Sequence, residues 1–139
     1  MSGCVLDTDV VIAALDRRDP HHSEAAKAIK AMSERDVPLL LSLVNYAETL
    51  VRPAEDESTL RAAKTALTAL GVQLVAPTRA IAVDAARHRG LNISLADGFA
   101  LATAQMRGAY VASFDRRVRR ALPKVGLRLA PQLSRGRAS

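Results

Sequence analysis

The stretch CVLDTDVVIAAL (residues 4–15) places two aspartates, Asp7 and Asp9, between a short apolar run and a second apolar segment. An unpaired carboxylate is costly to bury, so the pair indicates either a water-filled edge of the fold or a site that uses the negative charge. The run before the aspartates has the length of a strand, and the segment after them is typical of a helix. We therefore expect the aspartates to mark the point where a strand ends and a helix begins.

Strand-like and helix-like segments alternate along the rest of the chain. Aliphatic runs bounded by turn or polar residues recur at residues 37–41, 72–75, 110–112 and 125–129. Helical patterns separate them, at residues 23–34, 42–53, 57–71, 79–90 and 95–108, and the last three end on glycine. The final pattern is apolar nearly all round, which predicts a buried helix. The alternation, without hairpin signals, predicts an α/β fold with a parallel sheet of four to five strands covered on both faces.

Composition is consistent with a small globular domain. The 139 residues fit one domain, 1–139, with a short flexible basic tail expected from about residue 131. A hydrophobic fraction of 49% with only 3% aromatic residues predicts a soluble protein with an aliphatic core. The single cysteine excludes an intrachain disulfide, and neither a signal peptide nor a membrane-spanning run is evident. We therefore expect a cytoplasmic protein.

The charge is strongly positive, with 20 Lys and Arg residues against 14 Asp and Glu residues and a formal net charge of +6. The excess is mostly arginine, and it is dense in the segment FDRRVRRAL (residues 114–122) and in the final residues SRGRAS. Such an excess indicates a polyanionic partner, although a solvated basic surface is the alternative. Arginine matches phosphate geometry better than lysine does.

Acidic residues recur where the expected strands end. Because the carboxyl ends of parallel strands meet at one edge of the sheet, which is also where ligands bind in such folds, we expect these acids to share one crevice. The set comprises Asp7, Asp9, Glu48, Asp97 and Asp115.

Each acid also has a structural explanation when it is taken alone. The aspartates would cap helices, and Ser94 completes a capping-box pattern with Asp97. Glu48 would pair with Arg52, four residues later. Capping does not explain Glu48, however, because we place it beside an apolar stripe of its helix, formed by Leu43, Ala47, Leu50 and Val51.

A cluster of carboxylates predicts a bound cation. Like charges would keep protons on some of the acids unless a cation neutralised them. Carboxylate oxygens suit Mg²⁺ or Mn²⁺, which retain water and bind beside phosphate groups. His21 and His22 lack the spacing of metal ligands, and we expect them to be solvated residues near a helix start.

Four segments resemble a known family in their order and separation. VLDTDVVIAAL (5–15), SLVNYAETL (42–50), GLNISLADGFALATA (90–104) and VASFDRRVRRA (111–121) are similar to the acidic blocks of the PIN domain, most closely its bacterial VapC branch. The resemblance covers residues 5 to about 120. It implies a three-layer α/β/α PIN-like fold and a metal-dependent endoribonuclease. The catalytic quartet that it implies is Asp7, Glu48, Asp97 and Asp115.

The resemblance also implies a role for each residue. Asp7, Asp97 and Asp115 would hold one or two Mg²⁺ or Mn²⁺ ions, and Glu48 would bind the metal or its water. Water activated in this way would attack an RNA phosphodiester and leave a 5′-phosphate. Accessory polar residues would be Asp9, Asn45 and Ser113, although Asn45 would alternatively face solvent. Arginines that hold flanking RNA phosphates would be Arg116, Arg117, Arg119 and Arg120.

Members of the VapC branch are toxins of type II toxin–antitoxin systems. The resemblance therefore implies an RNA substrate and a cognate VapB-like antitoxin. We also expect a homodimer and a hetero-oligomer with the antitoxin. The alternative within the family is an RNA-processing nuclease without an antitoxin.

Two classes outside the family share part of the pattern. The D-x-D pair after the first strand resembles haloacid dehalogenase phosphatases, but that chemistry leaves Glu48 and the arginines unused. A receiver-like signalling module has a similar length and strand alternation. It requires a lysine just after the fifth strand, and the segment VGLRLAP (125–131) has none.

Overall fold

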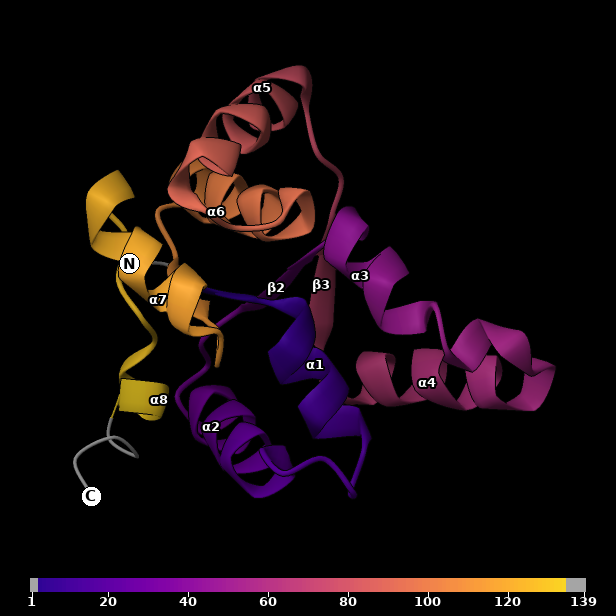
Figure 1. Cartoon of the computed structure of the whole chain (residues 1–139). Helices are drawn as coiled ribbons and strands as arrows, with labels where there is room; N and C mark the ends of the chain where they lie inside the picture. Colours follow the sequence, from indigo (N-terminus) through magenta and orange to yellow (C-terminus); the bar gives the residue numbers. More distant parts are fainter. Residues whose placement is uncertain (1–2, 135–139) are drawn as a thin grey trace.

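A four-stranded parallel sheet forms the centre of the molecule in the computed structural model, which describes residues 3–134 (Figure 1). The strands lie in the order β3-β2-β1-β4, and every neighbouring pair is parallel. The predicted α/β class and parallel sheet are confirmed, with four strands. The strand bounds are Cys4–Leu6 (β1), Leu39–Ser42 (β2), Val72–Val75 (β3) and Tyr110–Ala112 (β4).

The fifth strand expected at residues 125–129 is not formed. A 3₁₀ helix (η3, Leu122–Val125) with a proline in its first turn takes the start of this segment. Gly126 then follows with a φ of 73°. Only Leu129 reaches the sheet, through a single parallel bridge to Val111.

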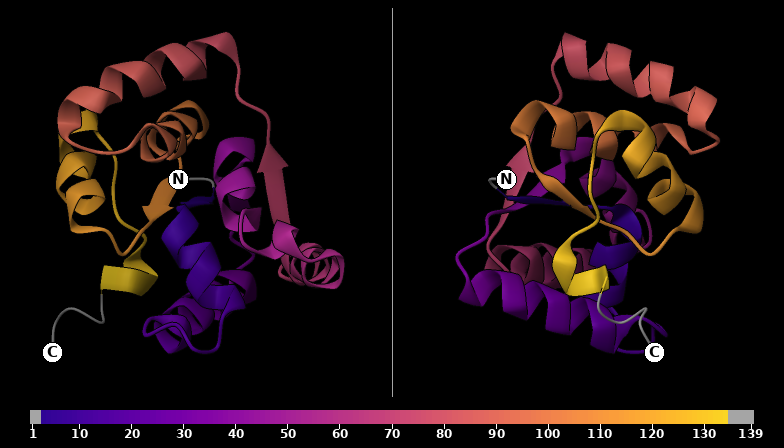
Figure 2. Two further views of the ribbon diagram at one scale, coloured as in Figure 1. Left: turned by 45° about the vertical axis from the view of Figure 1, so that its right-hand side comes forward. Right: turned by 90° about the vertical axis from the view of Figure 1, so that its left-hand side faces the viewer.

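Helices cover both faces of the sheet, which makes three layers (Figures 1 and 2). Alternate side chains of β1 point to opposite faces, so Cys4 and Leu6 belong to one core cluster and Val5 to the other. The first cluster packs under α1 (Thr8–Leu15) and α2 (His22–Glu34). The second packs under α6 (Leu95–Arg107) and α7 (Arg116–Ala121), and α5 (Arg79–Arg87) lies outside α6.

Helix α6 is buried as its apolar composition predicts. Its partner α5 approaches it closely at Gly98, where a Cβ atom would lie 2.7 Å from the carbonyl oxygen of Ala85. The contact is to backbone, so any side chain at this position would push the two helices apart. Gly98 follows Asp97 directly, and the close packing therefore fixes the first turn of α6 at the edge of the sheet.

Helix α3 (Leu43–Leu50) is rotated relative to our expectation. Its buried residues are Asn45 and Thr49, whereas Leu43 is 39% exposed and Val51, just after the helix, is 67% exposed. The predicted apolar stripe is therefore wrong. A polar face turns inward, and hydrogen bonds satisfy most of it: Thr49 Oγ1 donates to the Asn45 carbonyl (2.8 Å), whereas Asn45 Oδ1 is buried without a partner.

Two predicted boundaries also differ. The helical pattern at 79–90 breaks after α5 into a 3₁₀ turn, His88–Leu91, and the left-handed residue that stops it is Asn92 (φ 61°) rather than Gly90. Residues 131–134, expected to be flexible tail, form a short helix, α8 (Pro131–Ser134), because Leu133 is fully buried in the core. The remaining tail, residues 135–139 with Arg135 and Arg137, lies outside the described residues.

The other helical segments follow the sequence pattern. Helix α4 (Glu57–Ala69), preceded by a 3₁₀ turn (η1, Pro53–Glu55), extends away from the main body of the molecule (Figure 1). No helix among residues 3–134 is long and apolar enough to cross a membrane.

Candidate functional site

An acidic cleft of about 360 Å³ opens at the carboxyl edge of the sheet. All five acids singled out from the sequence line it, and they come from the starts of α1, α6 and α7 and from the middle of α3. The structure thus brings together residues that are up to 108 positions apart, although their roles as metal ligands stay predictions. The lining consists of Asp7, Thr8, Asp9, Ile12, Glu48, Ile93, Ser94, Asp97, Asp115 and Arg117.

Asp7 forms the floor of the acidic cleft and is almost fully buried, at 2% exposure. It is the N-cap of α1, where one carboxylate oxygen accepts from the Thr8 backbone N–H (2.9 Å) and the other accepts from Ser113 Oγ (2.8 Å). Burial raises the pKa of Asp7 well above its usual range. The charges of Asp9 and Asp97 raise this pKa further, whereas the hydrogen bonds from Ser113 and Thr8 lower it.

Asp9 lies in the first turn of α1 and is half-buried. Its Oδ2 accepts from the Phe114 backbone N–H (3.1 Å), whereas its Oδ1 is buried without a hydrogen-bond partner. Burial raises the pKa of the Asp9 carboxyl to about 6, and the charges of Asp115 and Asp97 contribute to the rise. A carboxylate oxygen without a protein partner is free to accept a hydrogen bond from water or to bind a cation.

Asp97 and Asp115 each combine a capping role with a place in the acidic cleft. Asp97 Oδ2 accepts from the Ser94 backbone N–H (3.1 Å), and Ser94 Oγ accepts from the Asp97 backbone N–H (3.0 Å), so the predicted capping box is formed. Asp115 Oδ1 caps α7 by accepting from the Arg117 and Val118 N–H groups. Because each cap uses one carboxylate oxygen, capping and ligand binding do not exclude each other.

Glu48 is held over the acidic cleft by a chain of hydrogen bonds. Its Oε1 accepts from Thr8 Oγ1 (2.7 Å), and Thr8 Oγ1 accepts from Asn45 Nδ2 (3.0 Å). Asn45 Nδ2 also donates to the Ala96 carbonyl (3.2 Å). A carbonyl only accepts, so this bond fixes the Asn45 amide with its nitrogen toward Thr8. The Thr8 proton is then directed at Glu48.

Asn45 therefore does not face solvent, which was one of the alternatives left open by the sequence, and its place as an accessory polar residue stays a prediction. It is fully buried and joins α1, α3 and α6 at the acidic cleft. Thr8 was missed, although its position between Asp7 and Asp9 places it at the same strand end. The signal in the sequence that could have revealed Thr8 is a hydroxyl residue directly beside a candidate acid.

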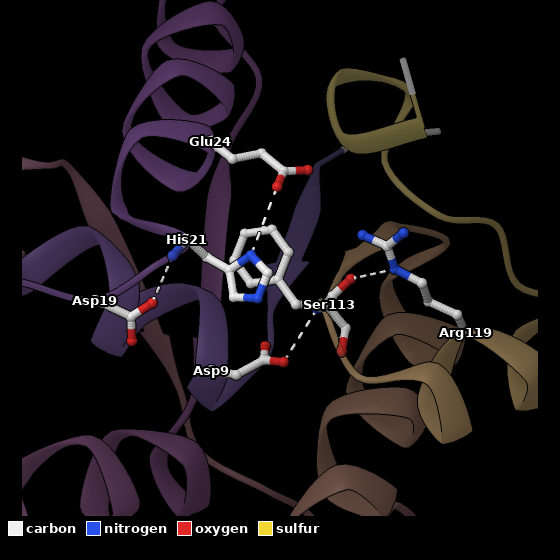
Figure 3. A network of polar contacts seen from close by, with 7 residues as sticks. Asp9, Asp19, His21, Glu24, Ser113 and Arg119 are labelled. Atoms are coloured by element: carbon white, nitrogen blue, oxygen red, sulfur yellow. Dashed lines mark hydrogen bonds and ion pairs between the residues drawn. The ribbon is translucent and has the colours of Figure 1, made fainter. Parts of the chain in front are cut away.

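Helix termini partly offset the negative charge of the cleft. The N-termini of α1, α6 and α7 all open on it, and the positive end of a helix dipole stabilises nearby carboxylates. Of the four arginines expected to bind RNA, Arg117 lines the cleft, and Arg116 and Arg120 are exposed on α7. Arg119 donates through Nε to the Ser113 carbonyl (2.7 Å), which holds the loop that carries Ser113 (Figure 3).

The donor set suits a hydrated cation rather than a tightly enclosed one. In the described part of the chain, no three His, Cys, Asp or Glu side chains converge closely enough to form a ready-made metal site. Mg²⁺ usually keeps several waters and binds proteins through one or two carboxylates, so a looser set of acids is compatible with it. Two further features are compatible with a bound cation: the pKa values of Asp7 and Asp9 are raised, and one Asp9 oxygen has no hydrogen-bond partner.

Residues 4–122 match the family model of the PIN domain, and the chain belongs to that family. A comparison with curated protein sequences finds no match. The strand order also differs from the 2-1-3-4-5 order of receiver-like folds. The family match removes the haloacid dehalogenase alternative, and the family match and the strand order together remove the receiver alternative.

Solved structures with the same fold include three bacterial proteins. A toxin–antitoxin complex from Klebsiella pneumoniae is 22% identical, with 81% of this chain and 87% of that chain covered and a TM-score of 0.65. Mycobacterium tuberculosis VapC20, described as a sarcin–ricin loop cleaving toxin, is 20% identical (86% and 95% covered, TM-score 0.66). FitAcB from Neisseria gonorrhoeae is also 20% identical (93% and 97% covered, TM-score 0.68). At these identities the likeness establishes the fold.

Proposed function

We propose that this protein is an endoribonuclease dependent on Mg²⁺ or Mn²⁺ and that it acts as the toxin of a type II toxin–antitoxin pair. The observation that carries the proposal is the convergence of five acids on one cleft in a chain of net charge +6. Positive charge elsewhere on the protein attracts a polyanion, while the acidic cleft requires a cation between it and a phosphodiester. PIN-family membership supports nuclease activity.

The residues of the acidic cleft have separable tasks in this proposal. Asp7, Asp97 and Asp115 would hold the metal ion, with Glu48 positioned by Thr8 to accept a proton from the attacking water. When bound, the divalent ion supplies positive charge that activates water for in-line attack and offsets charge on the phosphoryl oxygens. Arg117 would hold the phosphate beside the one that is cleaved. The products would carry 5′-phosphates.

The expected result is Mg²⁺-dependent cleavage of hairpin RNAs with randomised loops, because unpaired loop bases are the usual targets of sequence-selective RNA-binding proteins. Chelation should stop the cleavage. Asp97→Asn should reduce the rate about 10²-fold, since asparagine can keep the capping box but removes a negative ligand. Cleavage and the 5′-phosphate are read by gel mobility and by sensitivity to a 5′-phosphate-dependent exonuclease.

Asp56→Asn is the matched control for this experiment. Asp56 caps α4 by accepting from the Thr59 N–H (3.0 Å), but it lies outside the acidic cleft. The control should cleave RNA like the wild type. Mg²⁺ should also raise the melting temperature of the wild type more than that of Asp97→Asn. Equal Mg²⁺ responses would show that Asp97 is a helix cap and not a ligand.

An antitoxin of the VapB type is the proposed partner, and a homodimer is the proposed assembly of the toxin itself. The Klebsiella toxin–antitoxin complex and Rickettsia felis VapBC2, bound to a promoter DNA fragment, have the same fold (TM-scores 0.65 and 0.66). We expect the antitoxin to place an Arg or Lys among the cleft carboxylates, where a cation replaces the metal. An RNA-processing nuclease without an antitoxin is the remaining alternative.

The partner prediction is tested by co-expressing the neighbouring small open reading frame and solving the complex. RNA cleavage should fall when the partner binds, and replacement of its inserted basic residue by alanine should restore cleavage. A complex whose acidic cleft stays open and active would contradict this mode of inhibition.

A further inference from the structure

A second hollow, which we call the side hollow, lies beside the acidic cleft. Its volume is about 290 Å³. It shares Asp9, Ile12 and Asp115 with the acidic cleft, so the two spaces are adjacent and have a common wall. The residues that it adds are Asp19, His21 and Phe114.

A stacked ring pair lines the side hollow. The imidazole of His21 lies on the ring of Phe114 with centroids 4.4 Å apart and planes inclined by 15°. Phe114 packs against the core, whereas 54% of the His21 side chain is exposed. The pair therefore presents an accessible aromatic surface beside the residues proposed to cut RNA.

Local polar contacts position His21 (Figure 3), and a hydrogen bond from a distant segment positions the backbone of Phe114. The His21 backbone N–H donates to Asp19 Oδ1 (2.8 Å), and His21 Nδ1 lies 3.7 Å from a Glu24 carboxylate oxygen. The Phe114 N–H donates to Asp9 Oδ2. A surface fixed in advance in this way loses little conformational entropy when a ligand stacks on it.

The fold itself makes little use of the His21 imidazole. His21 occupies the N-cap position of α2, but its side chain makes no capping hydrogen bond. Its ion pair with Glu24 is exposed on both sides, and exposed pairs contribute little to stability. The position of the ring over Phe114 is therefore not explained by helix capping or by burial.

The charges around the side hollow select what can enter it. Asp9, Asp19 and Asp115 line it and Glu24 flanks it, so a backbone phosphate would be repelled there. A nucleobase carries no charge, can stack on an aromatic surface and can donate amino hydrogens to carboxylates. The volume lies at the lower end of the range of ligand pockets, about 300 Å³, which suits one heterocycle.

We propose that the side hollow is a stacking site for one unpaired nucleobase of the RNA whose phosphodiester lies in the acidic cleft, with His21 as the residue on which the base stacks. This proposal rests on the ribonuclease function proposed above. The stacked base would set which phosphodiester of a loop lies against the acids, because the two spaces share a wall. His21 and Phe114 thereby become determinants of cleavage position.

The test pairs a protein change with an RNA change. The probe is a hairpin RNA that the wild type cleaves, together with versions that carry one abasic nucleotide near the cleaved bond. One abasic position should lower the wild-type kcat/KM about tenfold, the effect of a lost stacking interaction. The His21→Ala protein should have a kcat/KM on intact RNA that is lower by a similar factor. Its kcat/KM should be the same on intact RNA and on the RNA with that abasic position. His21→Phe, which keeps a ring, should behave as the wild type does.

A structural role for His21 predicts a different result. If the wild type and His21→Ala lose the same factor at every abasic position, the stacking site is overturned. Melting temperatures of the two His21 variants should match that of the wild type, since the side chain is largely exposed.

A fluorescence measurement separates this proposal from the ribonuclease function. Hairpin RNA with 2-aminopurine in its loop is mixed with protein in Ca²⁺, and stacking quenches the fluorescence. Wild type and His21→Phe should quench it more than His21→Ala does. Equal quenching by all three proteins would remove the stacking site and leave the ribonuclease standing. If quenching depends on His21 but no RNA is cleaved in Mg²⁺ or Mn²⁺, the result would support the stacking site and contradict the proposed ribonuclease function.

Discussion

Asp7→Asn is expected to abolish RNA cleavage in Mg²⁺ and to leave the protein folded. Asp7 is the most deeply buried of the five acids, and both of its carboxylate oxygens are oriented by hydrogen bonds, from Thr8 and from Ser113. Asparagine keeps the shape of the side chain and one acceptor oxygen. It removes the negative charge that would attract the metal ion, and the expected loss in kcat is about 10²-fold or more.

The measurement is the initial rate of hairpin cleavage at saturating Mg²⁺, with circular dichroism and thermal melting as checks of folding. The two oxygens of Asp7 accept from a backbone N–H and from a hydroxyl, and the Ser113 hydroxyl can rotate to accept from the new amide. A folded variant is therefore expected. Retention of more than about a tenth of the wild-type rate would contradict a role for Asp7 as a metal ligand.

In a chelator, the wild type is expected to become more stable as the pH falls from about 7 to about 5. Burial raises the pKa of Asp9 from 3.8 to about 6, so between these values the folded state binds a proton that the unfolded state does not. The free energy of unfolding therefore falls as the pH rises through this window. The whole effect corresponds to about 3 kcal/mol at neutral pH. The raised pKa of Asp7 acts in the same direction.

Asp9→Asn should raise the melting temperature of the metal-free protein at pH 7 by about 5–10 °C and should flatten its pH dependence. The asparagine oxygen can still accept from the Phe114 N–H, so the packing of that loop is retained. Melting curves from pH 4 to pH 8 in chelator, with and without the substitution, measure the difference directly. Parallel curves for the two proteins would show that Asp9 carries no raised pKa. Added Mg²⁺ should stabilise the wild type more at pH 7 than at pH 5, because protonated carboxylates bind it weakly.

Local sequence patterns were sufficient for much of the fold. The strands at residues 4–6, 72–75 and 110–112 begin and end where the aliphatic runs do, and the capping box of Ser94 and Asp97 is formed as expected. These features depend on contacts within a few residues, so their signals survive in a single sequence. The convergence of the acids was also predictable, because the carboxyl ends of parallel strands share one edge.

The orientation of α3 was not predictable in this way. Apolar periodicity predicted that Leu43 and Val51 face the core, but the buried residues of α3 are Asn45 and Thr49. The Asn45 amide donates to Thr8 and Ala96, which are 37 and 51 residues away. A polar side chain can be buried when distant groups satisfy it, and no local pattern records whether those groups will be present.

The sequence by itself determined which chemistry this protein can carry, because its acids follow strand ends and its alternating elements require a parallel sheet. Only the tertiary structure decided how those acids and their neighbours are arranged. It left Asp9 with an unpartnered oxygen, directed the Thr8 hydroxyl at Glu48, and stacked His21 on Phe114. Each of these arrangements depends on side chains about 40 to 100 residues apart, which meet when the loops at one edge of the sheet pack together. The packing free energy that brings these loops together is a property of the whole core.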